Sequence, residues 1–453
     1  MCAAGYDGAM PEAKPALARE LGLRDLVLFN IAAVVGIRWL AAAAHAGPVS
    51  ISLWVAAGVL FFVPSALAVS RLASKLPEEG GLYTWTRRSF GDWHGFLCGW
   101  CYWLSNLFYF PNLLLAGIGM AVYGFGDRYV WLGNARAFVV PVSLAILWLG
   151  LLTNLVGLRV GKWTQNLGGL ATYAAGLVIV GLGAAVWFLH GPATPLRIFS
   201  GWDWGRLNFW SQIAFAFGGL ELGAIMGGEI RDPRRNVPRA AWISGVAIAA
   251  FYIAGTLAIL AILPAQQVNI LSGLTQAGAA AADLLHLPLV APLLALLITF
   301  GITGQLGAWL AGSARLPFAI GLDHYLPAAF ARLHPRWKTP HVAILTQGAA
   351  CTAFLLAMLL GEDLRIGYQL LVDMTVITYF IPFLYLFGAA ARHGLRTTAA
   401  AGLLVTVAGI AFSLVPPEGV ASVWRFEAKL AGGCLLLVAA GRIAFARGRR
   451  ARS

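Results

Sequence analysis

Two apolar segments of the chain each carry a charged residue two positions beyond a glycine. The two sets are Gly36 with Arg38 in segment 24–45, and Gly218 and Gly219 with Glu221 in segment 208–228. Each segment is long enough to cross about 30 Å of hydrocarbon. An ionisable side chain in that position costs about 2.5–3.5 kcal/mol on insertion scales, so it usually marks a pathway, a binding site or an ion pair.

A helix that is interrupted at the middle of a bilayer exposes peptide groups that lipid cannot satisfy. The N–H groups at the start of the second half-helix attract a carboxylate, and the C=O groups at the end of the first half-helix accept from an ammonium. If both segments break at their glycines, a zwitterionic amino acid fits between them. The alternative is that the glycines only allow close helix packing and that Glu221 is a structural hydrogen-bonding group. The chain has 53 glycines, so a glycine pair alone decides little.

A further buried charge, Asp373, is the single carboxylate of the apolar segment 366–388. If Arg38 begins the outer half of its segment, the two charges lie on the same side and pair. Such a pair acts either as a gate over a bound molecule or as a fixed salt bridge, and both readings stay open. An Arg38 that faces the cavity favours an acidic substrate and repels a diamine, whereas an Arg38 neutralised by Asp373 indicates little.

The composition predicts one polytopic membrane domain over residues 1–453. Hydrophobic residues make up 59% of the chain and charged residues 11%, whereas soluble proteins carry about a quarter charged residues. The formal charge of +13 comes from short basic clusters between apolar segments and not from one basic face, which argues against a nucleic-acid partner. The five cysteines are scattered and indicate no disulfide framework.

The hydropathy pattern predicts twelve transmembrane helices with both termini in the cytoplasm. They are expected near 24–45, 49–72, 93–122, 137–157, 163–188, 208–228, 239–262, 288–314, 341–360, 366–388, 397–414 and 425–445. Of the 32 Lys and Arg residues, 24 fall in the tails and loops on the N-terminal side, 7 on the opposite side, and Arg38 within a span. Cytoplasmic loops retain positive charge, so this asymmetry supports the even number of spans and a multi-pass protein of the cell membrane, plasma or inner.

Other chemistries find no support in the residue pattern. The eight histidines show no metal-ligand spacing, and Ser, His and Asp form no triad-like context. No nucleophile, cofactor motif or metal set occurs in the spans. We therefore expect no enzyme, no cofactor and no metal; the expected partners are a small amino acid or amine, protons as a coupling ion, and the lipid bilayer.

Three stretches resemble the amino acid–polyamine–organocation (APC) family of permeases. They are FAFGGLELGAIMGGEIRDPRRNVPRA, PEEGGLYTWTRRSFGDWHGFLCGW and ARLPFAIGLDHYLPAAFARLHPRWKTP. The first is similar to the family's sixth helix and the loop that follows, the second to the loop into helix 3, and the third to the stretch after helix 8. The matches extend over most of the chain from helix 1 to helix 10.

This resemblance implies a leucine-transporter-like fold and a secondary active transporter of amino acids. Residues 24–228 and 239–388 then hold the ten core helices, of which helices 1–5 and helices 6–10 are inverted repeats. Residues 397–445 hold helices 11 and 12, and residues 1–23 and 446–453 are cytoplasmic tails. Family members exchange amino acids or polyamines, or carry amino acids with protons by alternating access. The implied substrate-binding residues are Val35, Gly36, Ile37, Phe217, Gly218 and Gly219, with Asn106 and Tyr109 placed by spacing only. The resemblance implies a gating or proton-coupling role for Glu221; Arg38 and Asp373 are gating candidates from the argument on buried charges given above.

One departure from the family pattern bears on the substrate. The usual glycine triplet of helix 1 is replaced by Gly36-Ile37-Arg38, which is more like the branch that contains glutamate/GABA antiporters. Two alternatives therefore accompany the amino acid transporter: a polyamine or amine transporter of the same family, and a sensor that binds an amino acid without moving it.

Overall fold

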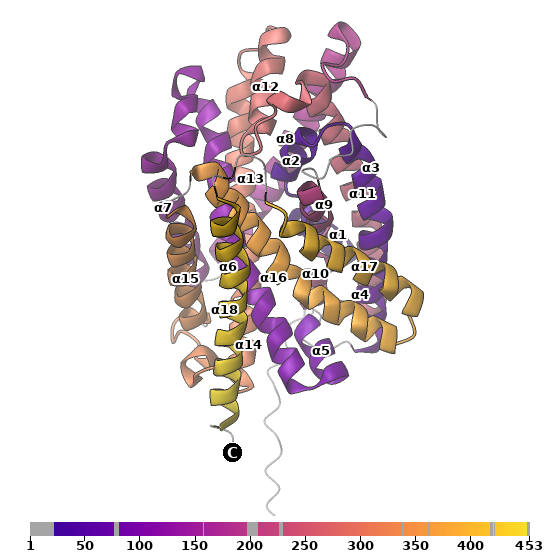
Figure 1. Ribbon diagram of the computed structural model, residues 1–453, viewed down its shortest axis with the longest axis vertical. Helices are drawn as coiled ribbons and strands as arrows, with labels where there is room; N and C mark the ends of the chain where they lie inside the picture. Colours follow the sequence, from indigo (N-terminus) through magenta and orange to yellow (C-terminus); the bar gives the residue numbers. More distant parts are fainter. Residues whose placement is uncertain are drawn as a thin grey trace, which may run out of the picture.

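The computed structural model of the protein is a bundle of α-helices, most of which run along one common direction (Figure 1). It describes residues 22–76, 81–156, 158–196, 207–225, 230–337, 339–360, 363–416, 420 and 422–450. Residues 1–21 of the expected N-terminal tail and the last three residues of the C-terminal tail lie outside this set.

The described chain forms eighteen α-helices and several short helical turns. They are α1 (Leu23–Val34), α2 (Arg38–His45), α3 (Val49–Ala57), the π-helical turn η1 (Gly58–Phe62), α4 (Val63–Lys75), α5 (Leu82–Phe90), α6 (Asp92–Ala121), η2 (Val122–Phe125), η3 (Asp127–Asn134), α7 (Arg136–Val156), α8 (Leu158–His190), α9 (Leu207–Phe215), α10 (Leu220–Ile225), α11 (Pro233–Ile262), η6 (Ala265–Gln267), α12 (Gly273–Leu284), α13 (Val290–Ser313), α14 (Arg315–Leu322), η7 (Ala328–Ala331), α15 (His341–Leu359), α16 (Leu364–Arg392), α17 (Arg396–Ser413) and α18 (Val423–Arg450).

Ten helical stretches of the described chain are long and apolar enough to cross a membrane. The two expected spans outside this set are 24–45 and 208–228. Each is divided in the structure, the first into α1 and α2 and the second into α9 and α10. The described residues thus form ten continuous apolar stretches and two divided ones. The division falls where the sequence places glycine and charge together, and the count of twelve spans stays a prediction.

The helices differ in how much of their surface the bundle covers. In α6 and α16, 83% of the most apolar stretch is buried inside the protein, against 28% for α7 and 22% for α18. A helix that is apolar on all sides is stable in the centre of a bundle, whereas one with an exposed apolar face must meet lipid in a membrane. Helices α6 and α16 therefore form the centre of the bundle and pack directly against each other, and α7 and α18 lie at its periphery.

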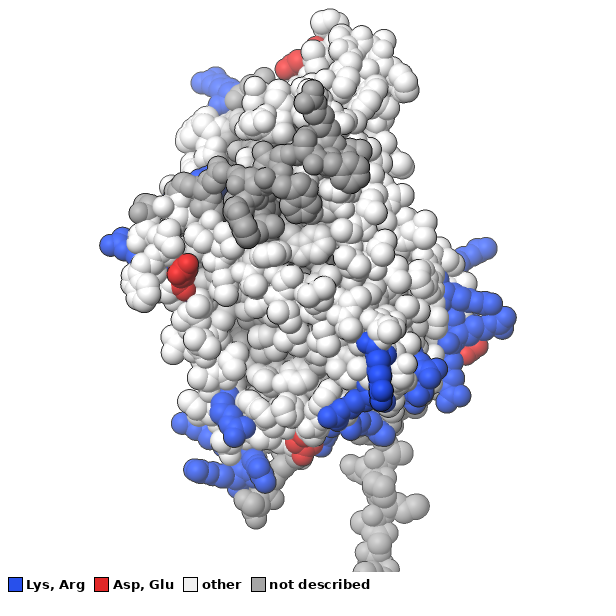
Figure 2. All heavy atoms as spheres, turned by 45° about the vertical axis from the view of Figure 1, so that its right-hand side comes forward, with Lys and Arg blue, Asp and Glu red and all other residues white. Residues whose placement is uncertain are grey.

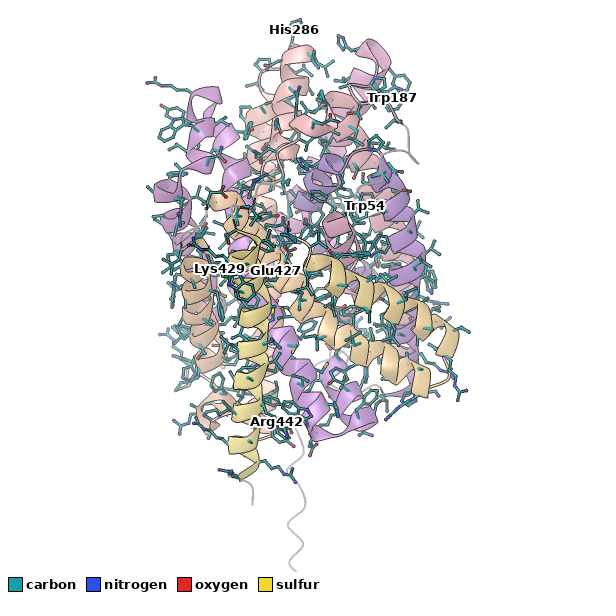
Figure 3. The ribbon with its side chains drawn as sticks, viewed as in Figure 1. Trp54, Trp187, His286, Glu427, Lys429 and Arg442 are labelled. Carbon is teal, nitrogen blue, oxygen red and sulfur yellow. The ribbon has the colours of Figure 1, made fainter. Side chains whose placement is uncertain are left out.

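Positive charge gathers at one end of the bundle. Most Lys and Arg side chains on the face shown in Figure 2 lie toward the lower end, the end at which α18 finishes in Figure 1. Figure 3 places Arg442 near that end, and Trp187 and His286 at the opposite end. This distribution is the one expected of a cytoplasmic face; that both termini lie in the cytoplasm stays a prediction.

At the basic end, a small polar network joins α5 to the segment that follows α14. Arg87 forms ion pairs with Asp92 at 2.6 Å and with Asp323 at 2.9 Å, and the Tyr83 hydroxyl donates to Asp323 at 2.5 Å. Burial, followed by the hydrogen bond to Asp323, raises the pKa of Tyr83 well above its ordinary value. Tyr83 therefore remains a hydrogen-bond donor at every physiological pH, and the contact links α5 to the segment that follows α14.

The crossing of α8 and α13 supplies a test of the fold. A Cβ atom at Gly168 of α8 would lie 2.5 Å from the Cα of Gly304 on α13, so Gly168→Val forces the helices apart. We expect a cost of about 1–3 kcal/mol and a lower melting temperature in detergent. The matched control is Gly181→Val on the same helix, where a Cβ meets no atom within 4 Å; equal melting temperatures for the two variants would contradict this crossing.

Candidate functional site

Both divided helices lose their regular hydrogen bonding at the predicted glycines. Helix α1 ends at Val34, Val35 is extended with φ −67° and ψ 102°, and α2 begins at Arg38. Helix α9 ends at Phe215 and α10 begins at Leu220. Gly219 lies between them with φ +120°, a conformation that residues with a side chain rarely adopt.

The two breaks lie against each other. A Cβ atom on Gly219 would be 3.1 Å from Val34 Cγ2 and 3.6 Å from the carbonyl oxygen of Ala33. A side chain at this position would press against Val34, so the glycine eases the close approach of one break to the other. The peptide groups of both breaks therefore face one shared volume in the centre of the protein.

One hydroxyl group holds both breaks together. The Tyr252 oxygen, on α11, accepts from the backbone N–H of Gly36 at 3.1 Å. Its O–H lies 2.8 Å from the carbonyl oxygen of Val34 and 3.0 Å from that of Ala216, and donates between them. A single buried side chain thus satisfies peptide groups of both divided helices.

Helix α13 satisfies two more carbonyl groups of the first break. Trp309 Nε1 donates to the Ala33 carbonyl at 3.1 Å, and Gln305 Nε2 donates to the Val35 carbonyl at 3.2 Å. Each carbonyl oxygen has a second lone pair. These groups therefore keep the capacity to accept one more hydrogen bond from a bound ammonium.

Glu221 satisfies the second break. Its side chain is buried, with 1% exposed. One carboxylate oxygen accepts from the Gly219 N–H at 3.1 Å, and the other accepts from the hydroxyls of Tyr379 at 2.6 Å and Tyr102 at 2.9 Å. Glu221 therefore links the break to α6, which carries Tyr102, and to α16, which carries Tyr379.

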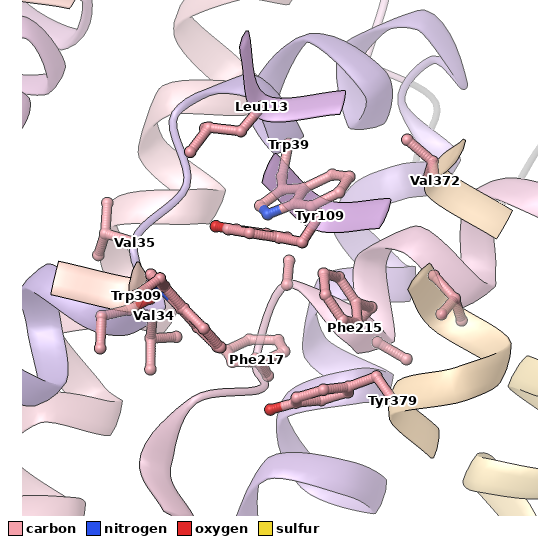
Figure 4. Close-up of a cluster of buried hydrophobic side chains, with 14 of the residues drawn as sticks. Val34, Val35, Trp39, Tyr109, Leu113, Phe215, Phe217, Trp309, Val372 and Tyr379 are labelled. Atoms are coloured by element: carbon pink, nitrogen blue, oxygen red, sulfur yellow. Dashed lines mark hydrogen bonds between the residues drawn. The ribbon is translucent and has the colours of Figure 1, made fainter. Parts of the chain in front are cut away.

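Aromatic side chains surround the volume between the breaks (Figure 4). The cavity that remains there is about 10 Å³, room for about one water molecule. Its lining residues come from both breaks and from α2, α6, α13 and α16; they are Ala33, Val34, Trp39, Tyr109, Phe215, Ala216, Gly218, Trp309 and Tyr379.

The glycines of the two breaks lie directly against aromatic rings. A Cβ at Gly36 would lie 2.6 Å from the Trp39 indole nitrogen, and one at Gly218 would lie 2.5 Å from the Tyr379 hydroxyl. Aromatic rings therefore cover both glycines.

Arg38 lies beside this cavity and is 1% exposed. Its Nη1 donates to the amide oxygen of Asn112 on α6. The guanidinium carbon lies 4.3 Å from the centre of the Trp39 ring and 4.6 Å from that of Tyr109. At this distance a cation is attracted by the face of an aromatic ring.

The structure thus brings part of the predicted residue set to the cavity and places the rest elsewhere. Tyr109 and Gly218 line the cavity, whereas Phe217 packs edge-on against Trp54 and Tyr252. The Asn106 amide donates to the Tyr102 carbonyl on its own helix at 2.8 Å. Asp373 is buried on α16 and accepts from Gln369 at 3.0 Å. Its pairing with Arg38 stays a prediction.

Several residues that sequence reasoning did not single out hold the site together. Tyr252, Trp309 and Gln305 satisfy the broken backbone, and Tyr379 covers Gly218 and binds Glu221. Their side chains resemble ordinary packing residues of apolar helices. Only Gln305 carried a signal, since an amide within an apolar span needs a buried partner.

Tyr252→Phe tests the clamp on the two breaks. The change removes the partner of one backbone N–H and two carbonyls in a buried site, so we expect a loss of about 1–3 kcal/mol in stability. Tyr173→Phe on α8 is the matched control, because the Tyr173 hydroxyl has no hydrogen-bond partner among the described residues. The measurement is thermal unfolding in detergent; an equal melting temperature for the two variants would exclude the clamp.

The chain matches known amino acid permeases over nearly its whole length. The family model described as amino acid permease matches residues 21–426. A similar protein is an uncharacterised transporter of Legionella pneumophila, 27% identical over 93% of this chain and 95% of that protein. Others are the serine/threonine exchanger SteT of Bacillus subtilis, 26% identical over 82% and 83% of the two chains, and a glutamate/gamma-aminobutyrate antiporter of Lactococcus lactis, 22% identical over 80% and 77%.

A solved structure has the same arrangement of helices. The crystal structure of MhsT in complex with L-phenylalanine aligns with 92% of this chain and 97% of its own, at a TM-score of 0.59 and 13% sequence identity. This match shows the leucine-transporter-like fold that the resemblance implied. Because the family model covers almost the entire chain, the protein belongs to the amino acid permease family, and its function is amino acid transport and not enzymatic catalysis.

Proposed function

We propose that the protein carries its amino acid by alternating access, with the substrate bound between the two divided helices. The observation that carries this proposal is the direct approach of the breaks, where Gly219 lies against Ala33 and Val34. Broken backbone in a membrane persists where it lines a cavity or is buried in protein, and in secondary transporters it forms the binding site.

The peptide groups of the breaks provide separate binding positions for the ammonium and the carboxylate of an amino acid. The ammonium group lies near the carbonyls of Ala33, Val34 and Ala216, each of which accepts one hydrogen bond already and has a second lone pair. The carboxylate lies at the start of α2, after Gly36, where the positive end of the helix dipole attracts an anion.

Substrate binding requires the aromatic rings to move, because the cavity holds about one water molecule. The described conformation is thus one in which the centre is closed. A second cavity of about 20 Å³ shares Ala33 and Trp309 with the first and extends to Arg315, at the start of α14. In the proposed cycle, Trp309 separates the two cavities, and release toward the basic end also requires the Arg87–Asp323 ion pair to open.

Glu221 is the proposed site of proton coupling. It is a buried carboxylate that binds the second break through the Gly219 N–H and two neighbouring helices through Tyr102 and Tyr379. Protonation removes the charge that accepts these hydrogen bonds and weakens them, since hydrogen bonds to an ionised group are about twice as strong as neutral ones. Proton-coupled symport and exchange both use this device, and two of the relatives are an exchanger and an antiporter by name.

The site disfavours the amine alternative. A buried arginine beside the cavity repels a substrate that is only cationic. The sensor alternative shares the binding site, and it predicts ligand-induced stabilisation without flux. Thermal-shift screening together with flux in liposomes separates the two.

Glu221→Gln tests the coupling role. In wild-type proteoliposomes, we expect uptake of labelled amino acids to rise when the outside is made more acidic than the inside. The glutamine cannot exchange a proton, so uptake by Glu221→Gln should not respond to the gradient, while exchange against internal amino acid continues at a reduced rate.

The matched control is Glu427→Gln, which removes a partly exposed carboxylate on the peripheral helix α18. It should leave the gradient response unchanged. Full proton-driven uptake by Glu221→Gln would refute the coupling role, and ligand binding by the wild type without any flux would refute transport.

A further inference from the structure

Arg38 has hydrogen-bonding capacity that the protein itself does not use. Nη1 is bound to Asn112, but Nε and Nη2 have no hydrogen-bond partner among the described residues. A buried donor without a partner destabilises the protein, and a charged one does so more strongly. A guanidinium in this state can donate from both nitrogens to a bound ligand.

The partners that Arg38 has do not neutralise its charge. Among the residues that the structure describes, they are the amide oxygen of Asn112 and the faces of Trp39 and Tyr109, all uncharged. The Asn112 amide is held in turn by the carbonyl of Phe108 at 3.1 Å and the hydroxyl of Thr375 at 3.0 Å. The guanidinium is therefore held in place by uncharged groups.

The geometry of the unused nitrogens specifies the ligand. Nε–H and one Nη2–H point in the same direction along one edge of the guanidinium plane, at the spacing of the two oxygens of a carboxylate. Asn112 occupies Nη1 and so leaves this edge unoccupied. A carboxylate binds there with two parallel hydrogen bonds.

Arg38 is also within reach of the central cavity. The two rings that contact its guanidinium, Trp39 and Tyr109, line that cavity. The Trp39 indole covers Gly36, so the ring must turn aside when an amino acid binds there. The same movement brings the cavity into contact with Arg38.

We propose that Arg38 binds the side-chain carboxylate of the substrate, and that the protein transports acidic amino acids in preference to neutral or basic ones. This inference rests on the proposed binding of an amino acid between the breaks. The start of α2 and the carbonyls of α1 serve the two groups that all amino acids share, which leaves the Arg38 edge for the side chain. Asn112 acts as a positioning residue, because it fixes the edge that Arg38 presents.

Pairs of substrates with nearly the same shape separate the effect of the side-chain charge on uptake from the effect of side-chain size. Glutamate and glutamine, or aspartate and asparagine, differ in little but one carboxylate, so their uptake ratio in proteoliposomes reports the contribution of Arg38. We expect the wild type to favour each acid over its amide by about 10-fold or more. Arg38→Gln should lower uptake of each acid more than uptake of its amide and so bring the ratio of acid to amide close to one. Arg38→Lys keeps the charge without the two-point geometry, and should give an intermediate ratio.

Arg128→Gln, at an exposed arginine of η3, is the matched control and should keep the wild-type ratio. Monodispersity and melting temperature report whether each variant folds. If Arg38→Gln fails to fold, the uptake ratios of the wild type and of Arg38→Lys test the inference. Equal uptake of acids and amides by the wild type would overturn the inference and leave the proposed function standing. An equal loss of both by Arg38→Gln would also overturn it, because Arg38 would then serve a group common to all amino acids. No flux of any amino acid would instead refute the proposed function.

Discussion

The constraint on which this structure depends is that lipid cannot satisfy a free peptide group. A helix that breaks inside the bilayer must find partners for its N–H and C=O groups within the protein. Here those partners are side chains from other helices: Tyr252 serves both breaks, Trp309 and Gln305 serve the first, and Glu221 serves the second. The site is therefore a property of several helices at once, and the breaks persist because the helices around them supply these groups.

These partners also connect the site to the rest of the bundle. Glu221 joins the second break to α6 and α16 through the hydroxyls of Tyr102 and Tyr379. Helices α6 and α16 are the most completely buried of the ten long apolar stretches. A change in the charge of one carboxylate thus acts directly on the centre of the bundle, where rigid packing transmits small displacements.

Charge is distributed across the site with a clear asymmetry. The second half of the first divided helix begins at a buried arginine, and the second half of the other carries a buried carboxylate in its first turn. The carboxylate has three hydrogen-bond donors, whereas two of the three guanidinium nitrogens have no partner among the described residues. The negative charge is therefore satisfied by the protein, and the positive charge is the one that a ligand completes.

Composition and charge pattern by themselves determined the class of protein, the approximate spans and the two places where a helix breaks. Both are read from short stretches of sequence, because a span needs a minimum apolar length and a buried charge in a bilayer has a high free-energy cost. They also singled out Glu221 and Arg38, whereas Tyr109 was placed near the site only by the family resemblance. Side-chain direction and long-range partners were decided only by tertiary structure: Phe217 packs away from the cavity, and Tyr252, 218 residues from the carbonyl that it binds, became recognisable only in the fold. A tyrosine in an apolar helix shows no preference for one distant partner until packing brings the two helices together.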